Sequence, residues 1–108
     1  MAKKKTNFEM LLWGVKHIAK NHGFNSNTED WEEDGEVCIW GGCNVPTLCD
    51  VQMLCDDLGI PREYIESSEY GIDIFIPQDW YDLKRDMPFK GMCLWKKHRR
   101  FFLYTKIM

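Results

Sequence analysis

The 108-residue sequence lacks any apolar run approaching the roughly 18 to 20 residues that a membrane-spanning helix needs. Neither an apolar stretch nor a small-residue cleavage site follows the three lysines near the N-terminus, so we expect no secretory signal. We therefore predict a cytoplasmic protein without a membrane segment. Internal repeats, low-complexity tracts and long linkers are also absent, and the length is close to the commonest domain size. The sequence predicts a flexible basic tail at residues 1–5 and a single domain at residues 6–108.

No recognisable catalytic or cofactor motif is present, so we predict no catalytic residue, no cofactor and no enzyme. Five cysteines are many for this length, namely Cys38, Cys43, Cys49, Cys55 and Cys93. In a reducing compartment most of them are expected to be small buried hydrophobes. The first four are separated by four, five and five residues, whereas zinc ligands usually come in pairs two to four residues apart. The sequence therefore predicts no metal site.

One alternative is a thiol-dependent enzyme or zinc protein centred on Cys38 and Cys43. Cys43 follows two glycines and precedes a predicted helix, where the helix dipole would lower the pKa of a thiol. No flanking catalytic signature accompanies it. This alternative therefore ranks below a binding function.

Two amphipathic helices are predicted from apolar residues that recur every three or four positions. Their apolar stripes comprise Phe8, Leu11, Leu12, Val15, Ile18 and Ala19 in the first helix and Leu48, Val51, Leu54, Cys55 and Leu58 in the second. Thr6 and Glu9 have the spacing of a capping box, and Gly23 is expected to end the first helix. Thr47 is expected to cap the second helix and Gly59 to end it.

Short strands and a third helix complete the predicted order of elements. The predicted strands are residues 37–40, 64–66, 72–76, 92–95 and 101–108, with a turn at Ser67-Ser68, a polar loop at 25–35 and a short helix at 78–87. The short connections favour an antiparallel or mixed sheet. The predicted fold class is α+β, a small domain with helices packed on one face of a four- to five-stranded sheet and a C-terminal β-hairpin.

An acidic run within the predicted loop is the first candidate binding site. It consists of Glu29, Asp30, Trp31, Glu32, Glu33, Asp34 and Glu36, six acids in eight residues with one tryptophan among them. The spacing lacks the alternating ligands and central glycine of an EF-hand calcium loop. One interpretation is a solubilising surface. The other is a contact surface that mimics nucleic acid or docks on a basic groove, with the ring as anchor and the charges steering association.

A basic stretch near the C-terminus is the second candidate. It comprises Trp95, Lys96, Lys97, His98, Arg99, Arg100 and Phe101, and it combines bases and rings as a nucleic-acid-binding surface does. A charged hairpin tip is the alternative interpretation. Because the chain is acidic as a whole, with a formal net charge of −3, we expect any nucleic-acid affinity to be weak and sensitive to salt.

A local pattern at Leu54–Pro61, running on to Ile65, resembles the helix-turn boundary of repressor-type helix-turn-helix domains. The resemblance implies a recognition helix beginning at Pro61, but serines and a glycine follow within ten residues and Arg62 is the only base. We therefore interpret this segment as the end of a well-capped helix.

The function favoured by the sequence is that of a non-enzymatic interaction protein that binds a protein or nucleoprotein partner through the acidic run. Regulators and inhibitors of host machinery encoded by phages and mobile elements have this kind of composition, an analogy that concerns class and not descent. A nucleic-acid-binding module that uses the basic stretch is the alternative from a second class. The sequence predicts neither the identity of the partner nor the oligomeric state.

Overall fold

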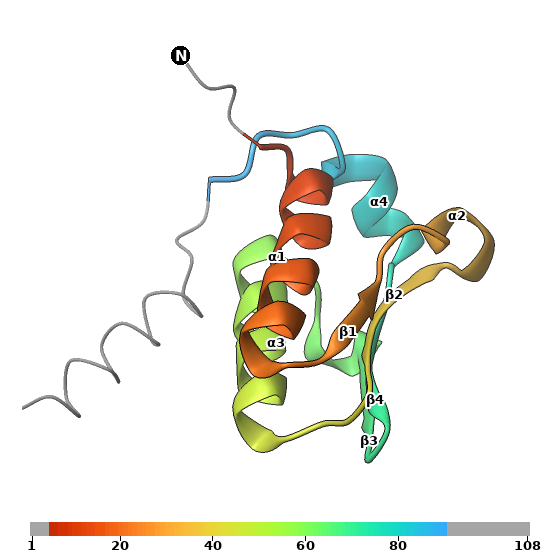
Figure 1. Cartoon of the computed structure of the whole chain (residues 1–108). Helices are drawn as coiled ribbons and strands as arrows, with labels where there is room; N and C mark the ends of the chain where they lie inside the picture. The colour runs from red at the N-terminus through yellow and green to blue at the C-terminus, as the bar shows by residue number, and fades with distance from the viewer. Residues whose placement is uncertain (1–4, 91–108) are drawn as a thin grey trace, which may run out of the picture.

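The computed structural model describes residues 5–90 and arranges them as two long helices against a four-stranded sheet (Figure 1). The elements in chain order are α1 (Asn7–His22), β1 (Asn25–Asn27), α2 (Trp31–Asp34), β2 (Glu36–Trp40), α3 (Val45–Leu58), the 3-10 helix η1 (Arg62–Tyr64), β3 (Ile65–Ser68), β4 (Gly71–Phe75) and α4 (Gln78–Lys84). The predicted α+β class is confirmed. The predicted C-terminal hairpin lies outside the described residues.

Helix α1 begins and ends as its sequence predicts. The Thr6 hydroxyl accepts a hydrogen bond from the Glu9 backbone N–H at 3.1 Å, and the Glu9 carboxylate accepts one from the Thr6 N–H at 2.9 Å. This reciprocal capping box satisfies two of the backbone donors that a helix N-terminus leaves open. Gly23 ends the helix in the left-handed conformation, with φ of 78°, which glycine adopts without steric cost.

Helix α3 begins earlier than predicted. The N-cap is Asn44, not Thr47, because the Asn44 side-chain oxygen accepts bonds from both the Thr47 N–H at 2.8 Å and the Thr47 hydroxyl at 2.6 Å. Pro46 occupies the first turn, where its missing N–H costs no hydrogen bond. Gly59 ends the helix as predicted, and η1 and β3 follow it, so the segment after Pro61 forms no recognition helix.

The sheet is antiparallel throughout, in the order β1-β2-β4-β3. Two sequence predictions were wrong here. The segment 25–35 is not only a loop, because β1 pairs with β2 and the following residues form α2. The hairpin turn lies at Glu69-Tyr70 and not at Ser67-Ser68, which belong to β3.

Helices α1 and α3 cover one face of the sheet, and the core lies between the two layers (Figure 1). Its members include Leu11, Val15 and Ile18 of α1, Val51, Leu54 and Leu58 of α3, and Val37, Ile39, Ile72 and Ile74 of the sheet, all nearly inaccessible to solvent. The helices pack closely where α1 has Gly14, since a Cβ there would lie 2.7 Å from a methyl carbon of Leu54. The buried stripes predicted from periodicity therefore meet in one core.

Helix α4 closes the end of the molecule at which α1 begins. The indole of Trp80 is buried and donates a hydrogen bond to the Leu58 carbonyl at 2.8 Å. The helix ends at Lys84, three residues before the predicted end, and the next turn bonds to α1 through the Asn7 N–H and the Met87 carbonyl at 2.8 Å. These contacts fix the chain up to Phe89 against the start of α1.

Replacing Gly71 by alanine should destabilise the fold, because a Cβ at this position would overlap the backbone carbonyl of Ile39 in the neighbouring strand β2. Backbone cannot rotate away as a side chain can, so we expect Gly71→Ala to lower the free energy of unfolding by about 1 to 3 kcal/mol. Urea denaturation followed by circular dichroism measures this. Ser67→Ala, on the exposed edge strand of the same hairpin, is the control, and equal stabilities of the two variants would contradict the close approach of β2 and β4.

Candidate interaction surface

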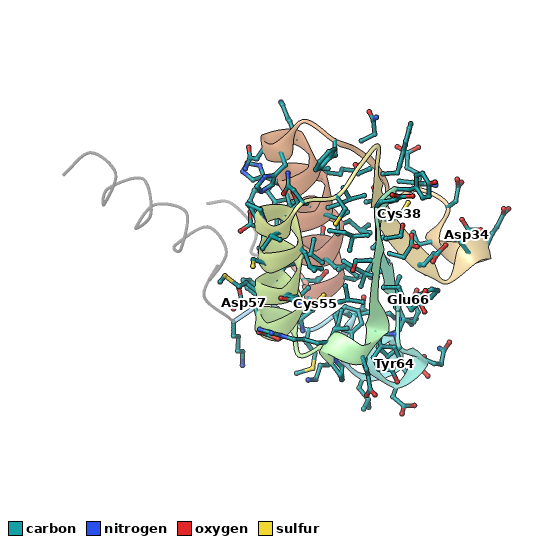
Figure 2. All side chains as sticks on the ribbon, turned by 90° about the horizontal axis from the view of Figure 1, so that it is seen from below. Asp34, Cys38, Cys55, Asp57, Tyr64 and Glu66 are labelled. Carbon is teal, nitrogen blue, oxygen red and sulfur yellow. The ribbon has the colours of Figure 1, made fainter. Side chains whose placement is uncertain are left out.

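The face of the sheet opposite α1 and α3 carries the candidate site. Side chains alternate along each strand, so the residues next to the buried valine and isoleucines of β2 and β4 point to this other side. In Figure 2, Cys38 and Glu66 lie on this side, whereas Cys55 of α3 lies on the helix side. Within residues 5–90 no helical layer covers this face, which we call the open face. Its side chains come from Asn25, Asn27, Glu36, Cys38, Trp40, Glu66, Ser68, Asp73 and Phe75.

The strand register places the acids of the open face side by side. Asp73 of β4 pairs with Cys38 of β2 on one side and with Glu66 of β3 on the other. Glu36 lies two residues from Cys38 on the same face and is therefore a diagonal neighbour of Asp73. Three carboxylates from three adjacent strands thus occupy one small area.

Burial and the neighbouring negative charges both raise the pKa of two groups on this face. Burial, and then the charges of Asp73, Asp34 and Glu66, raise the pKa of the Glu36 carboxyl above its usual value of 4.5. Burial and the charge of Asp73 likewise raise the pKa of the Cys38 thiol. In both cases nearby negative charge disfavours adding another negative charge. Because Asp34 contributes to the pKa of Glu36, the acids of α2 and of the open face act as one charged surface.

Within residues 5–90, no basic side chain of the strands offsets the charge of these acids. None of β1, β2, β3 and β4 contains lysine or arginine, and no ion pair joins Glu36, Glu66 or Asp73 to a basic side chain of the described chain. All 17 Asp and Glu of the protein lie between Glu9 and Asp86, whereas only seven of its 14 Lys and Arg lie in residues 5–90. Those residues therefore carry a formal charge of −10, and their bases lie on and beside the helices.

The predicted acidic run divides between α2, its flanks and the open face. Glu29, Asp30, Glu32, Glu33 and Asp34 are exposed, and Glu36 is the first residue of β2. Figure 2 shows Asp34 on the same side of the sheet as Glu66. The run and the open face thus form a continuous acidic surface.

Trp31 occupies a different environment from the one that an exposed anchor requires. Its ring is half-buried, with its centroid 4.6 Å from that of Phe8 and 5.3 Å from that of Tyr81. These contacts tie α2 to α1 and α4. The exposed rings beside the acids are instead Trp40, with 52% of its surface accessible, and Tyr70, with 74%. The Gly41 and Gly42 N–H groups both donate to the Tyr70 carbonyl, which holds the hairpin turn beside the end of β2.

Sequence reasoning missed the open face because its acids are scattered along the chain. Glu66 and Asp73 are isolated acids in two separate strands, and only the register β2-β4-β3 brings them to Glu36. The alternation of Asp73 between two isoleucines was the available signal, since it marks a strand with one face away from the core. The basic stretch from Trp95 to Phe101 lies outside the described residues and stays a prediction.

The cysteines are less buried than predicted. Of the four in residues 5–90 only Cys55 is fully buried, and burial raises its pKa to about 12. Cys38, Cys43 and Cys49 are only partly buried, so the expectation that most of the thiols are buried does not hold for these three. Cys38 lies on the open face of β2, whereas Cys43 lies in the loop before α3 and packs against the edge of the core. The Cys43 thiol donates a weak bond to the Asn44 carbonyl at 3.9 Å. No group of three or more metal-ligating side chains converges within the described part of the chain.

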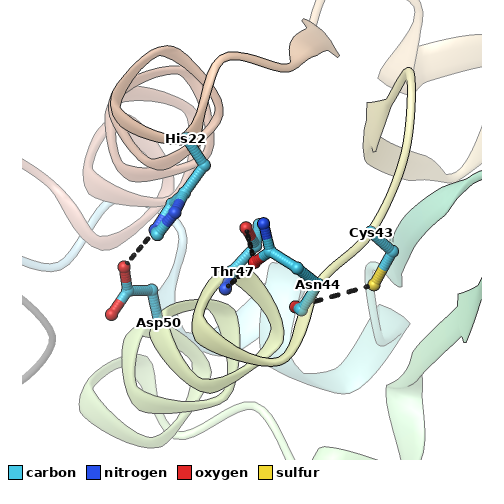
Figure 3. Close-up of polar contacts among 5 residues, drawn as sticks. All are labelled: His22, Cys43, Asn44, Thr47 and Asp50. Carbon is cyan, nitrogen blue, oxygen red and sulfur yellow. Dashed lines mark hydrogen bonds and ion pairs between the residues drawn. The ribbon is translucent and has the colours of Figure 1, made fainter.

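A polar cluster joins the end of α1 to the start of α3 (Figure 3). Nε2 of His22 lies 2.7 Å from Oδ2 of Asp50, and both side chains are largely buried. Thr47 lies one turn before Asp50 in α3, and Asn44, which Thr47 contacts, is the N-cap of that helix. This arrangement links the two helices, and it explains why Asp50, a charged residue, sits in the buried layer.

Comparison with known proteins gives no relative, since no family model, curated protein or solved structure matches this chain. Among the helices of residues 5–90, none has the length and apolar character required to cross a membrane.

Replacing Glu36 by glutamine should stabilise the protein at neutral pH. Because the pKa of Glu36 is raised in the folded state, that state binds more protons than the unfolded state in the window just above pH 4.5, and stability falls as the pH rises through it. Thermal unfolding of Glu36→Gln should therefore show a higher melting temperature than the parent at pH 7. At pH 3 no gain is expected, because the Glu36 carboxyl of the parent is protonated in both the folded and the unfolded state. Glu63→Gln, an exposed carboxyl outside the strands, is the control. A lower melting temperature for Glu36→Gln at pH 7 would contradict the repulsion.

The raised pKa values of Cys38 and Cys55 predict slow reaction of both thiols at pH 7.5, because the thiolate is the reactive form. Alkylation by iodoacetamide, measured for each cysteine by mass spectrometry of peptides, should be slower at both than in free cysteine. Faster alkylation of Cys38 than of free cysteine would favour the thiol-enzyme alternative.

Proposed function

We propose that this protein is a non-enzymatic interaction protein that binds a basic segment of a partner protein through the open face and the adjoining acids of α2. The observation that carries the proposal is the uncovered sheet face whose carboxylates have no cation of the described chain beside them. By covering a basic groove or tail of its partner, the protein would regulate or inhibit the binding of other molecules to that basic surface.

The energetics of the acids support a charged partner. Like charges in neighbouring strand positions destabilise a sheet by a few tenths of a kcal/mol to about 1 kcal/mol per pair. A lysine or arginine side chain placed between Glu36, Asp73 and Glu66 would relieve this repulsion and form charge-assisted hydrogen bonds. The partner would therefore gain free energy from contacts that residues 5–90 do not themselves supply.

The exposed rings supply the apolar part of the interface. Trp40 lies on the open face and Tyr70 lies beside it in the hairpin turn, and both are residue types that dominate binding energy in protein interfaces. An arginine side chain can stack on such a ring while its guanidinium pairs with a carboxylate. Phosphate groups are repelled by the same acids, so nucleic acid is the less favourable ligand for this face.

Binding of a fluorescein-labelled arginine octapeptide to the full chain, followed by fluorescence anisotropy at low salt, tests the proposal. The variant Glu36→Gln/Glu66→Gln/Asp73→Asn removes three carboxylates from the open face and should weaken binding at least tenfold, because each lost charge pair removes a favourable contact. The affinity of the parent should fall as salt rises.

The matched control Glu63→Gln/Asp79→Asn/Asp86→Asn removes three exposed carboxylates outside the strands and gives the same net charge. It should change the affinity less than threefold. An equal loss in both triple variants would show that the peptide responds only to net charge, and retention of full affinity by the open-face variant would exclude this surface.

A further inference from the structure

The part of the sequence after residue 90 is complementary to the acidic surface in both charge and ring content. It carries five Lys and Arg and no acid, with four of the five bases within Lys96–Arg100. Trp95 and Phe101 flank that run. The described residues, in contrast, have a formal charge of −10, and no cation of residues 5–90 forms an ion pair with their acids on the open face. The chain therefore contains its own basic, aromatic segment of the kind that the open face fits.

The point at which the described chain ends places this segment within reach of the acids. The Phe89 N–H donates to the Lys5 carbonyl at 2.9 Å, so residue 90 begins beside the start of α1. Phe8, in the first turn of α1, touches Trp31 of α2 with ring centroids 4.6 Å apart. Figure 1 shows the end of the described chain on one side of the start of α1 and α2 on the other.

The length of chain is sufficient to span this separation. The six residues from Lys90 to Lys96 reach roughly 20 Å when extended, and each further residue adds about 3.4 Å. Phe89 lies beside Lys5, the first turn of α1 leads from there to Phe8, and the Phe8 ring contacts Trp31 of α2. The bases can therefore reach Asp34 and Glu36 without any change in the described fold.

We propose that Lys96–Arg100 of this chain docks on the acids of α2 and the open face within the same molecule, and that it occupies the surface which a basic partner uses. The identity of the surface rests on the proposed function above. A tethered segment acts at an effective concentration of the order of 1 mM. If its own dissociation constant is about 100 µM, an external basic partner binds roughly tenfold more weakly than it would to the free face. Only a partner that binds more tightly or is more abundant would therefore displace the segment.

Zero-length crosslinking of the full chain with a water-soluble carbodiimide tests the docking directly. The reagent joins a lysine amine to a carboxylate in contact with it, so Lys96 or Lys97 should be linked to Asp34, Glu36, Glu66 or Asp73. The linked peptides should come from the monomer band of a denaturing gel. Links to carboxylates elsewhere only, or none, would overturn the proposal, and links confined to the dimer band would assign the face to the segment of a second copy instead.

Competition measures the regulatory consequence. The variant Lys96→Gln/Lys97→Gln/Arg99→Gln/Arg100→Gln should bind the arginine octapeptide at least fivefold more tightly than the parent. The control Lys16→Gln/Lys20→Gln/Lys84→Gln/Lys90→Gln reaches the same net charge by removing bases from the described residues, and it should gain less than twofold.

The outcomes separate this inference from the proposed function. Equal affinities for the parent and both variants would overturn the docking while leaving peptide binding by the open face intact. Equal gains in the two variants would also overturn it, because net charge alone would then explain the change. Absence of peptide binding in all three proteins would overturn the proposed function itself.

Discussion

The two-sidedness of strands β2 and β4 is the constraint on which the rest of this structure depends. Val37, Ile39, Ile72 and Ile74 must all face α1 and α3, since this buries the apolar surface that stabilises the fold. Because side chains alternate along a strand, the residues between them face the opposite side of the sheet. A shift of one residue in the pairing of β2 and β4 would expose the isoleucines and bury the acids, which fixes the register strongly. The acidic surface is thus a consequence of how the core forms.

Elements defined by local chemistry were predictable from the sequence. The capping box of Thr6 and Glu9, the glycine stops at Gly23 and Gly59 and the apolar stripes of α1 and α3 all appear where the pattern placed them. The start of α3 was missed because Asn44 and Thr47 are both capping residues, and the choice of Asn44 depends on a hydrogen bond to Thr47 that spacing alone does not reveal. Local signals fix the type of an element better than its first residue.

Elements defined by distant contacts were not predictable. Asn25–Asn27 has no apolar residue and becomes a strand only because β2 offers it an edge. The four-residue helix α2 would not be stable alone, and Trp31 holds it by contacts with rings from α1 and α4. The same limit applied to the candidate site. Six of its acids adjoin one another in sequence, but Glu66 and Asp73 join them only through the sheet register.

The charge pattern connects fold and function. Burial, and then repulsion by the neighbouring carboxylates, raise the pKa of Glu36, so its ionised form costs some stability. A basic ligand would remove this cost in stability, whether the ligand comes from a partner or is Lys96–Arg100 of the same chain. Under the two proposals, the acidic surface binds the partner and Lys96–Arg100 competes with the partner for that surface.

Binding of a basic peptide to the open face can be mapped by NMR. In this experiment the ¹⁵N-labelled full chain is titrated with the arginine octapeptide at low salt. If the peptide binds the open face, the largest amide shifts will occur at Cys38, Trp40 and Asp73, on the strands of that face, and Lys16 and Lys20 of α1 will not shift. Shifts centred on α1 and α3, or none at all at saturating peptide, would contradict it.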